Sequence, residues 1–103
     1  MSDILTRLAA LIDARKDADP ATSWTATLLA KGPDKAAEKF GEEAVEAIIA
    51  AAKGDKANLT AEAADVLYHL LVMLTASDVK LTDVLAELER RQGTSGLTEK
   101  ANR

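Results

Sequence analysis

Several residue types that would define a fold or a site are absent from this sequence or rare in it. There is no cysteine, which excludes a disulfide framework, a zinc–thiolate centre and a thiol nucleophile. The 103 residues include two prolines and three aromatic residues, so the core must be built from Leu, Ile, Val and Ala.

Long hydrophobic runs are also absent. The longest apolar stretch, residues 66–75, is interrupted by Tyr68 and His69 and falls short of the roughly 18 residues that cross a bilayer. The first residues lack the basic region and following apolar stretch of a secretory signal. We therefore expect a cytoplasmic protein with no membrane partner.

The charge balance is acidic, with 13 basic and 17 acidic residues and a net charge of −4. This balance disfavours binding to nucleic acid or to an anionic membrane, because both would be repelled. The length is typical of one domain, which we expect to span residues 1–103.

Apolar residues recur at helical spacing along most of the chain, and no segment alternates as strands do. Ser23 is suited to an N-cap, Gly32 to the position after a helix and Pro33 to a first turn. The pattern predicts an all-α bundle of four to five helices. The expected helices run from a cap at Ser2 to Ile12, from Trp24 to Lys31, from Pro33 to Gly54, from Asn58 or Thr60 to about Ser77, and from about Thr82 to Arg91, followed by a partly ordered tail at 92–103.

The fourth expected helix is apolar on nearly its whole circumference between Val66 and Leu74. A helix with this pattern is buried on all sides, and a domain this small offers few partners to surround it. We therefore expect a homodimer joined through helices. The alternative is a central helix in a compact monomer.

Five acidic residues form two clusters with helical spacing, Glu42-Glu43-x-x-Glu46 and Glu62-x-x-Asp65, with 15 residues between the clusters. Two helices folded back on each other would direct these carboxylates into one volume, where like charges are costly unless a cation lies among them. The alternative is a solvated acidic face. Two features argue against a solvated face. Glu42 and Glu46 are like charges at i,i+4 spacing and repel each other, and Asp65, a poor helix former, lies in an apolar helix.

Oxygen ligands favour Mg²⁺, with Mn²⁺ as an alternative, over zinc. Mg²⁺ commonly binds carboxylates together with substrate phosphates, and such a site can polarise a phosphoryl oxygen and activate water for phosphoanhydride hydrolysis. A glutamate that is not fully used as a ligand can serve as general base.

Two further residues near the acids have two interpretations each. Lys39 lies four residues before Glu43, so it either forms an ordinary helix ion pair or meets a substrate phosphate. His69 is a lone histidine in an apolar helix, and we expect a hydrogen-bonded core or interface residue rather than a metal ligand.

The acidic clusters belong to a longer pattern of four segments, residues 23–32, 39–46, 62–71 and 95–101. This pattern resembles the all-α nucleoside triphosphate pyrophosphohydrolases (MazG-like), and among them the phosphoribosyl-ATP pyrophosphohydrolase family. The acids alone point to the superfamily, whereas Tyr68-His69 and Ser95-Gly96-Leu97 point to the narrower family. Trp24 stands where the family more often has tyrosine.

The resemblance implies Mg²⁺-dependent hydrolysis of a small phosphorylated nucleotide, phosphoribosyl-ATP, to phosphoribosyl-AMP and pyrophosphate, the second step of histidine biosynthesis. It also implies a homodimer. The implied metal ligands are Glu43, Glu46, Glu62 and Asp65, the implied catalytic residues are Glu42, Glu43 and Glu46, and the implied substrate contacts are Lys39, Arg91, Ser95 and Lys100. Glu42 lies beside the ligands, as a further ligand or as the base that orients water.

Two other functions fit the same pattern. One is a housecleaning pyrophosphatase that acts on dUTP, dCTP or a modified nucleotide. The other is a helical dimerisation module without enzymatic activity, whose acids are only surface residues.

Overall fold

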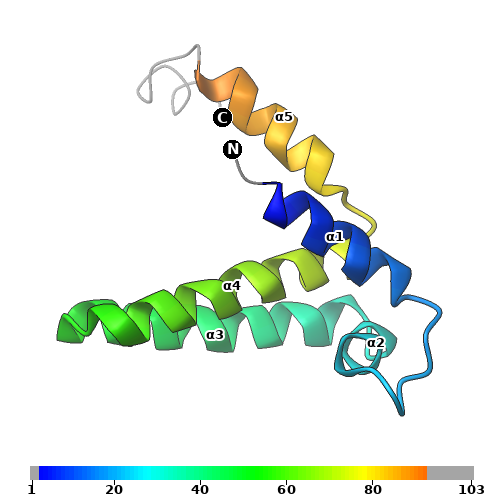
Figure 1. The fold of residues 1–103 in the computed structure, drawn as a ribbon, viewed down its shortest axis with the longest axis horizontal. Coiled ribbons are helices and arrows are strands. Elements are labelled where there is room, and N and C mark those ends of the chain that lie inside the picture. The colour runs from blue at the N-terminus through cyan, green and yellow to red at the C-terminus, as the bar shows by residue number, and fades with distance from the viewer. Residues whose placement is uncertain (1–2, 93–103) are drawn as a thin grey trace.

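The computed structural model describes residues 3–92, and within this range all regular structure is helical (Figure 1). The all-α prediction is confirmed. The five helices are α1 (Ile4–Ala14), α2 (Trp24–Ala30), α3 (Pro33–Lys53), α4 (Lys56–Ala76) and α5 (Leu81–Gln92).

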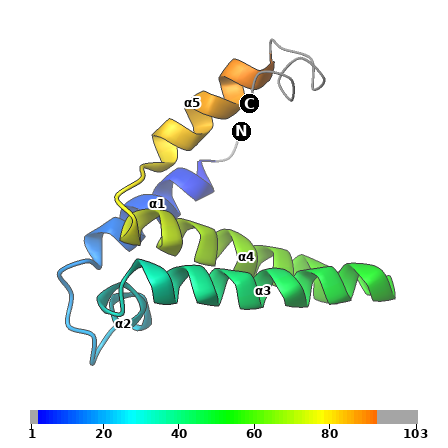
Figure 2. The ribbon, with the colours of Figure 1, turned by 180° about the vertical axis from the view of Figure 1, so that it is seen from behind.

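The two longest helices, α3 and α4, lie side by side as an antiparallel hairpin (Figures 1 and 2). Gly54 ends α3 in the left-handed conformation, with φ of 71°, which glycine adopts without a steric penalty. Asp55 then caps α4, because its side chain accepts a hydrogen bond from the backbone N–H of Asn58 at 3.0 Å. The predicted start at Asn58 or Thr60 was therefore wrong, because the capping carboxylate comes earlier.

The residues predicted to begin and end the helices around α2 take the expected positions. The Ser23 side chain caps the helix by accepting a hydrogen bond from the N–H of Ala26 at 3.1 Å. Gly32 follows the end of α2 with φ of 91°, and Pro33 occupies the first turn of α3. The first helix differs slightly: Asp3 precedes α1 without a side-chain cap, and the predicted cap Ser2 lies outside the described residues.

The core lies where α1 and α2 meet the hairpin, near the beginning of α3 and the end of α4 (Figure 1). Its buried residues come from four helices and are Ile12, Leu28, Ala36, Leu71 and Val72. This core fixes α1 and α2 against one end of the hairpin, while the other end of the hairpin projects beyond them (Figure 2).

A single chain leaves much of the apolar surface of the hairpin uncovered. The large apolar side chains exposed there are Val45 (53%), Ile48 (65%), Ile49 (47%) and Leu67 (43%). The burial of α4 on all sides is thus not achieved within one chain. Helix α5, which has no buried residue, extends away from the hairpin in both views. The dimer stays a prediction, and these faces are the surface that a second chain would cover.

Helix α4 is long and apolar enough, by length and mean hydropathy alone (1.3 over an 18-residue window), to cross a membrane. Every such window of α4 contains Glu62 and Asp65. Carboxylates within a bilayer are costly, and α4 packs along α3. These features favour a core helix over a membrane span.

The cap of α4 gives a stability prediction. Asp55→Ala removes the acceptor for the N–H of Asn58, and we expect it to lower the free energy of unfolding by about 1 kcal/mol. Asp55→Asn is the matched control, since asparagine caps equally well. Urea unfolding of both variants measures the difference, and equal losses would show that the cap is not the cause.

Candidate metal and phosphate site

The hairpin brings carboxylates of α3 and α4 together near its middle. Glu43, Glu62 and Asp65 each offer one carboxylate oxygen, and these oxygens all lie within 4.8 Å of one another. Glu62 and Asp65 are three residues apart and share a face of α4, which packs against the face of α3 that carries Glu43. We call these three residues the acidic cluster.

The electrostatics of Glu62 reflect this crowding. Its pKa is raised, first by the desolvation that accompanies its partial burial, then by repulsion from Glu46, Asp65 and Glu43. The hairpin therefore holds negative charge that its own packing does not neutralise. A raised pKa of this kind is typical of sites that bind a cation.

The other two predicted acids lie beside the cluster. Glu46 is exposed and outside the group of three oxygens, but its charge acts on Glu62 more strongly than that of any other carboxylate. Glu42 lies farther out, with 53% of its side chain exposed against 13% for Glu43. Of the five acids, the hairpin thus gathers three, keeps Glu46 close and leaves Glu42 at the edge.

Lys39 is the cation that α3 supplies at this edge. Its Nζ lies 3.5 Å from Oε1 of Glu42 and 3.8 Å from Oε2 of Glu43. The ordinary helix ion pair is therefore formed. Because the side chain is partly exposed and the distances are long, the pair leaves its ammonium accessible to an anionic ligand.

His69 is buried, with 7% of its surface exposed, as predicted for a core residue. Its ring lies edge-on to that of Tyr68, with 4.9 Å between centroids. Burial lowers its pKa, and nearby Glu43 opposes this shift. The expected hydrogen bonding is incomplete, because Nδ1 has no hydrogen-bond partner among residues 3–92.

Of the predicted substrate contacts near the C-terminus, the structure describes only Arg91, on the helix that extends away from the hairpin. Arg91 lies on α5, where its Nε donates to Glu87 Oε2 at 2.9 Å. Hydrogen bonds from Arg90 and Arg91 lower the pKa of Glu87 to about 2. Ser95 and Lys100 lie outside the described residues.

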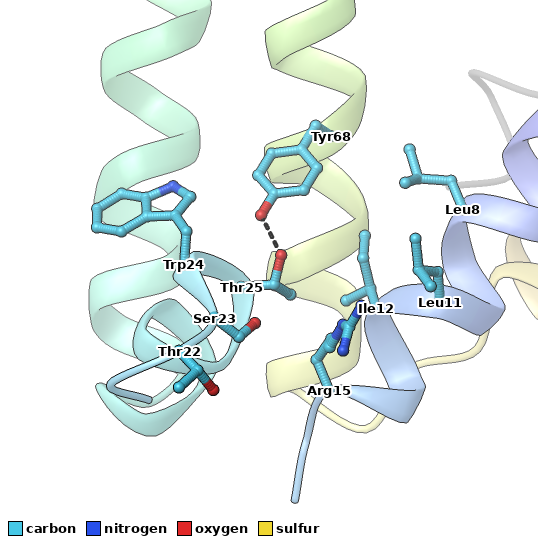
Figure 3. A pocket seen from close by; sticks show the side chains of 9 residues that line it. All are labelled: Leu8, Leu11, Ile12, Arg15, Thr22, Ser23, Trp24, Thr25 and Tyr68. Carbon is cyan, nitrogen blue, oxygen red and sulfur yellow. Dashed lines mark hydrogen bonds between the residues drawn. The ribbon is translucent and has the colours of Figure 1, made fainter. Parts of the chain in front are cut away.

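A cavity that the sequence did not predict opens beside the site, between α1, α2 and α4 (Figure 3). Its volume is about 250 Å³, and its polar lining includes Arg15, Ser23, Thr25 and Tyr68. A hydrogen bond between the hydroxyls of Thr25 and Tyr68 joins α2 to α4 across it. Arg15 had no sequence signal, because it lies in a polar loop whose position depends on the tertiary structure.

The donor set of the acidic cluster fits a hard divalent cation. It consists of carboxylate oxygens alone, close enough to share one ion, and among the described residues its like charges are offset only by the long ion pair from Lys39 to Glu43. A zinc site would need nitrogen or sulfur donors, and the ring of His69 is not part of this group.

The sequence pattern of the family described as Phosphoribosyl-ATP pyrophosphohydrolase matches residues 5–92. The chain belongs to the phosphoribosyl-ATP pyrophosphohydrolase family. The match covers all of α2, α3, α4 and α5 and nearly all of α1, and therefore includes the acidic cluster and the cavity.

Relatives of the family align with nearly the full chain. The protein named phosphoribosyl-ATP pyrophosphatase from Dinoroseobacter shibae is 74% identical over 100 residues, which is 97% of this chain and 98% of the relative. Proteins of the same name from Jannaschia sp. and Rhodobacter capsulatus are 74% and 73% identical over 99 residues, with 96% of this chain covered in each case and 97% and 96% of the relatives.

The raised pKa of Glu62 predicts a pH dependence of stability. A carboxyl whose pKa is raised by folding favours the folded state below its ordinary pKa, and this contribution is lost as the pH rises through the raised value. Glu62→Gln should therefore stabilise the metal-free protein at pH 7.5 relative to wild type, and this gain should shrink at pH 4. Thermal unfolding in EDTA measures both.

Glu89→Gln, an exposed substitution on α5, is the control and should show no such pH dependence. Added Mg²⁺ should raise the melting temperature of wild type more than that of Glu62→Gln. If the change in melting temperature relative to wild type depends on pH equally for Glu62→Gln and Glu89→Gln, repulsion at Glu62 does not cost stability.

Proposed function

We propose that the protein hydrolyses phosphoribosyl-ATP to phosphoribosyl-AMP and pyrophosphate in the cytoplasm, as the second step of histidine biosynthesis. The observation that carries the proposal is the acidic cluster, found in a chain of this family. Within the described residues the cluster has one long ion pair, from Lys39 to Glu43, and its carboxylates otherwise repel one another across α3 and α4, which supports a role in binding a metal–triphosphate complex.

Mg²⁺, or Mn²⁺ in its place, would be held by Glu43, Glu62 and Asp65, with Glu46 as the fourth ligand. When bound, the ion would neutralise the carboxylates, polarise the phosphoryl oxygens of the substrate and lower the pKa of a bound water. Glu46 is included because its charge acts directly on Glu62.

The protein's own residues must bind the triphosphate and accept a proton from the attacking water. Lys39, at the edge of the cluster, can exchange its long ion pairs for a phosphate oxygen. Glu42 lies outside the cluster but shares Lys39 with Glu43, which suits a carboxylate that orients water and takes its proton. The water oxygen then bonds to the α-phosphorus, the bond from this phosphorus to the α,β-bridging oxygen breaks, and pyrophosphate leaves with that oxygen.

The same proposal includes a homodimer. The exposed apolar residues of α3 and α4 form a face that a second hairpin can cover, and covering it removes apolar surface from water. The unpartnered α5, which carries the predicted substrate contact Arg91, would then lie near the site of either subunit.

The assay that tests the activity measures pyrophosphate release from phosphoribosyl-ATP with Mg²⁺ present. dUTP, dCTP and ATP are offered in parallel. We expect phosphoribosyl-ATP to have the largest kcat/KM. Faster turnover of a deoxynucleotide would support a housecleaning role instead, and no hydrolysis of any substrate would support a dimerisation module.

Substitution at the cluster tests its role. Asp65→Asn keeps the shape of the side chain but removes a metal-binding charge, and we expect kcat to fall roughly hundredfold or more with the helical content unchanged. Glu89→Gln, an exposed substitution on α5, is the control and should retain activity. Wild-type turnover by Asp65→Asn would remove this residue from the site.

The dimer is tested at the exposed apolar face. Ile48→Glu places a charge on a residue that is 65% exposed in the single chain, so the isolated chain should still fold. We expect wild type to have twice the mass of 10.9 kDa by light scattering and Ile48→Glu to dissociate at micromolar concentration. Lys35→Glu, an exposed substitution near the beginning of α3, should remain dimeric. A wild-type monomer would overturn the dimer.

A further inference from the structure

The cavity between α1, α2 and α4 is lined by a cation, Arg15, that forms no ion pair with the part of the chain that the structure describes. Arg15 follows the end of α1, and its side chain is one of those that line the cavity (Figure 3). Among residues 3–92 it forms no ion pair, whereas Arg7 on the same helix pairs with Asp3 at 3.1 Å and the neighbouring Lys16 with Asp13 at 3.3 Å. The fixed fork of donors on an arginine matches the oxygens of a phosphate.

The rest of the lining suits a phosphorylated sugar. Ser23 accepts a hydrogen bond from the N–H of Ala26, which leaves its hydroxyl proton available to a ligand. Thr25 and Tyr68 add two further hydroxyls, already oriented by their mutual hydrogen bond. Leu8 and Ile12 close the opposite side with apolar surface (Figure 3). The cavity thus combines a cation, hydroxyls and an apolar wall.

Trp24 connects this cavity to the acidic cluster. Its indole is 58% exposed, although tryptophan is usually well covered. It lines the cavity and also a second groove, which contains Lys39 and Glu42 at the edge of the cluster. On the other side, Tyr68 lies one helical turn after Asp65 on α4. A single ligand can therefore extend from the cluster over the indole into the cavity.

Phosphoribosyl-ATP has anionic groups at two ends, a triphosphate on one ribose and a monophosphate on the other, with the adenine between them. We propose that the cavity binds the second ribose phosphate, that Arg15 contacts this monophosphate, and that Trp24 stacks on the adenine. This inference rests on the proposed function and assigns the part of the substrate that does not react. Arg15 then distinguishes phosphoribosyl-ATP from nucleotides with one phosphorylated ribose.

The test compares phosphoribosyl-ATP with ribosyl-ATP, the same molecule without the second ribose phosphate. Wild type should favour phosphoribosyl-ATP by about ten- to hundredfold in kcat/KM, which is the range for hydrogen bonds to a charged group. In Arg15→Gln this preference should fall to near one, chiefly through a rise in KM for phosphoribosyl-ATP. Arg7→Gln is the control and should keep the wild-type preference.

Two more variants keep the test decisive. Arg15→Lys retains the charge but not the forked donors of the guanidinium, so it should keep part of the preference for phosphoribosyl-ATP over ribosyl-ATP. It provides the measurement if Arg15→Gln fails to fold. Trp24→Ala should raise KM for both substrates, and Trp24→Phe should restore it, because stacking needs an aromatic ring rather than a particular one.

The possible failures are distinct. If Arg15→Gln keeps the wild-type preference, or loses activity equally on both substrates, Arg15 does not read the second phosphate and the inference is overturned while the proposed function stands. If wild type releases no pyrophosphate from phosphoribosyl-ATP, the proposed function itself fails and the inference falls with it.

Discussion

Packing of α3 against α4 places like charges close together, and the rest of the structure depends on this contact. The hairpin gains from buried apolar surface and loses from the repulsion among Glu43, Glu62 and Asp65. This repulsion has a use if the carboxylates hold a cation, as proposed above. The two small helices, α1 and α2, brace one end of the hairpin through the shared core and add the cavity beside it.

The ends and periods of the helices were largely predictable, because they follow from local chemistry. Ser23, Gly32 and Pro33 act where single-residue preferences place them. The start of α4 was mispredicted because Asn58 and Thr60 are also good capping residues, and only the structure shows that Asp55 takes this role. Spacing predicted that all five acids would meet between two helices folded back on each other, and the structure brings together Glu43, Glu62 and Asp65.

Other parts of the site were beyond sequence reasoning. The resemblance set Glu42 apart from the four implied ligands, but only the structure shows that its position on α3 puts it beside Lys39 at the edge of the site. The apolar residues of α3 were expected to serve a core, and in one chain Val45, Ile48 and Ile49 are exposed. Arg15 becomes a candidate binding residue only because residues of α1, α2 and α4 form a cavity at its position. Each of these facts depends on how helices pack, which periodicity within one helix does not determine.

The turn at Gly54 and Asp55 controls the geometry of the acidic cluster although it lies at the end of the hairpin. It sets the rotational phase of α4 relative to α3. Removal of one residue between Gly54 and Glu62 would turn every following side chain by about 100°, and Glu62 and Asp65 would then face away from Glu43. The length of this connection should therefore tolerate change as little as the acids themselves.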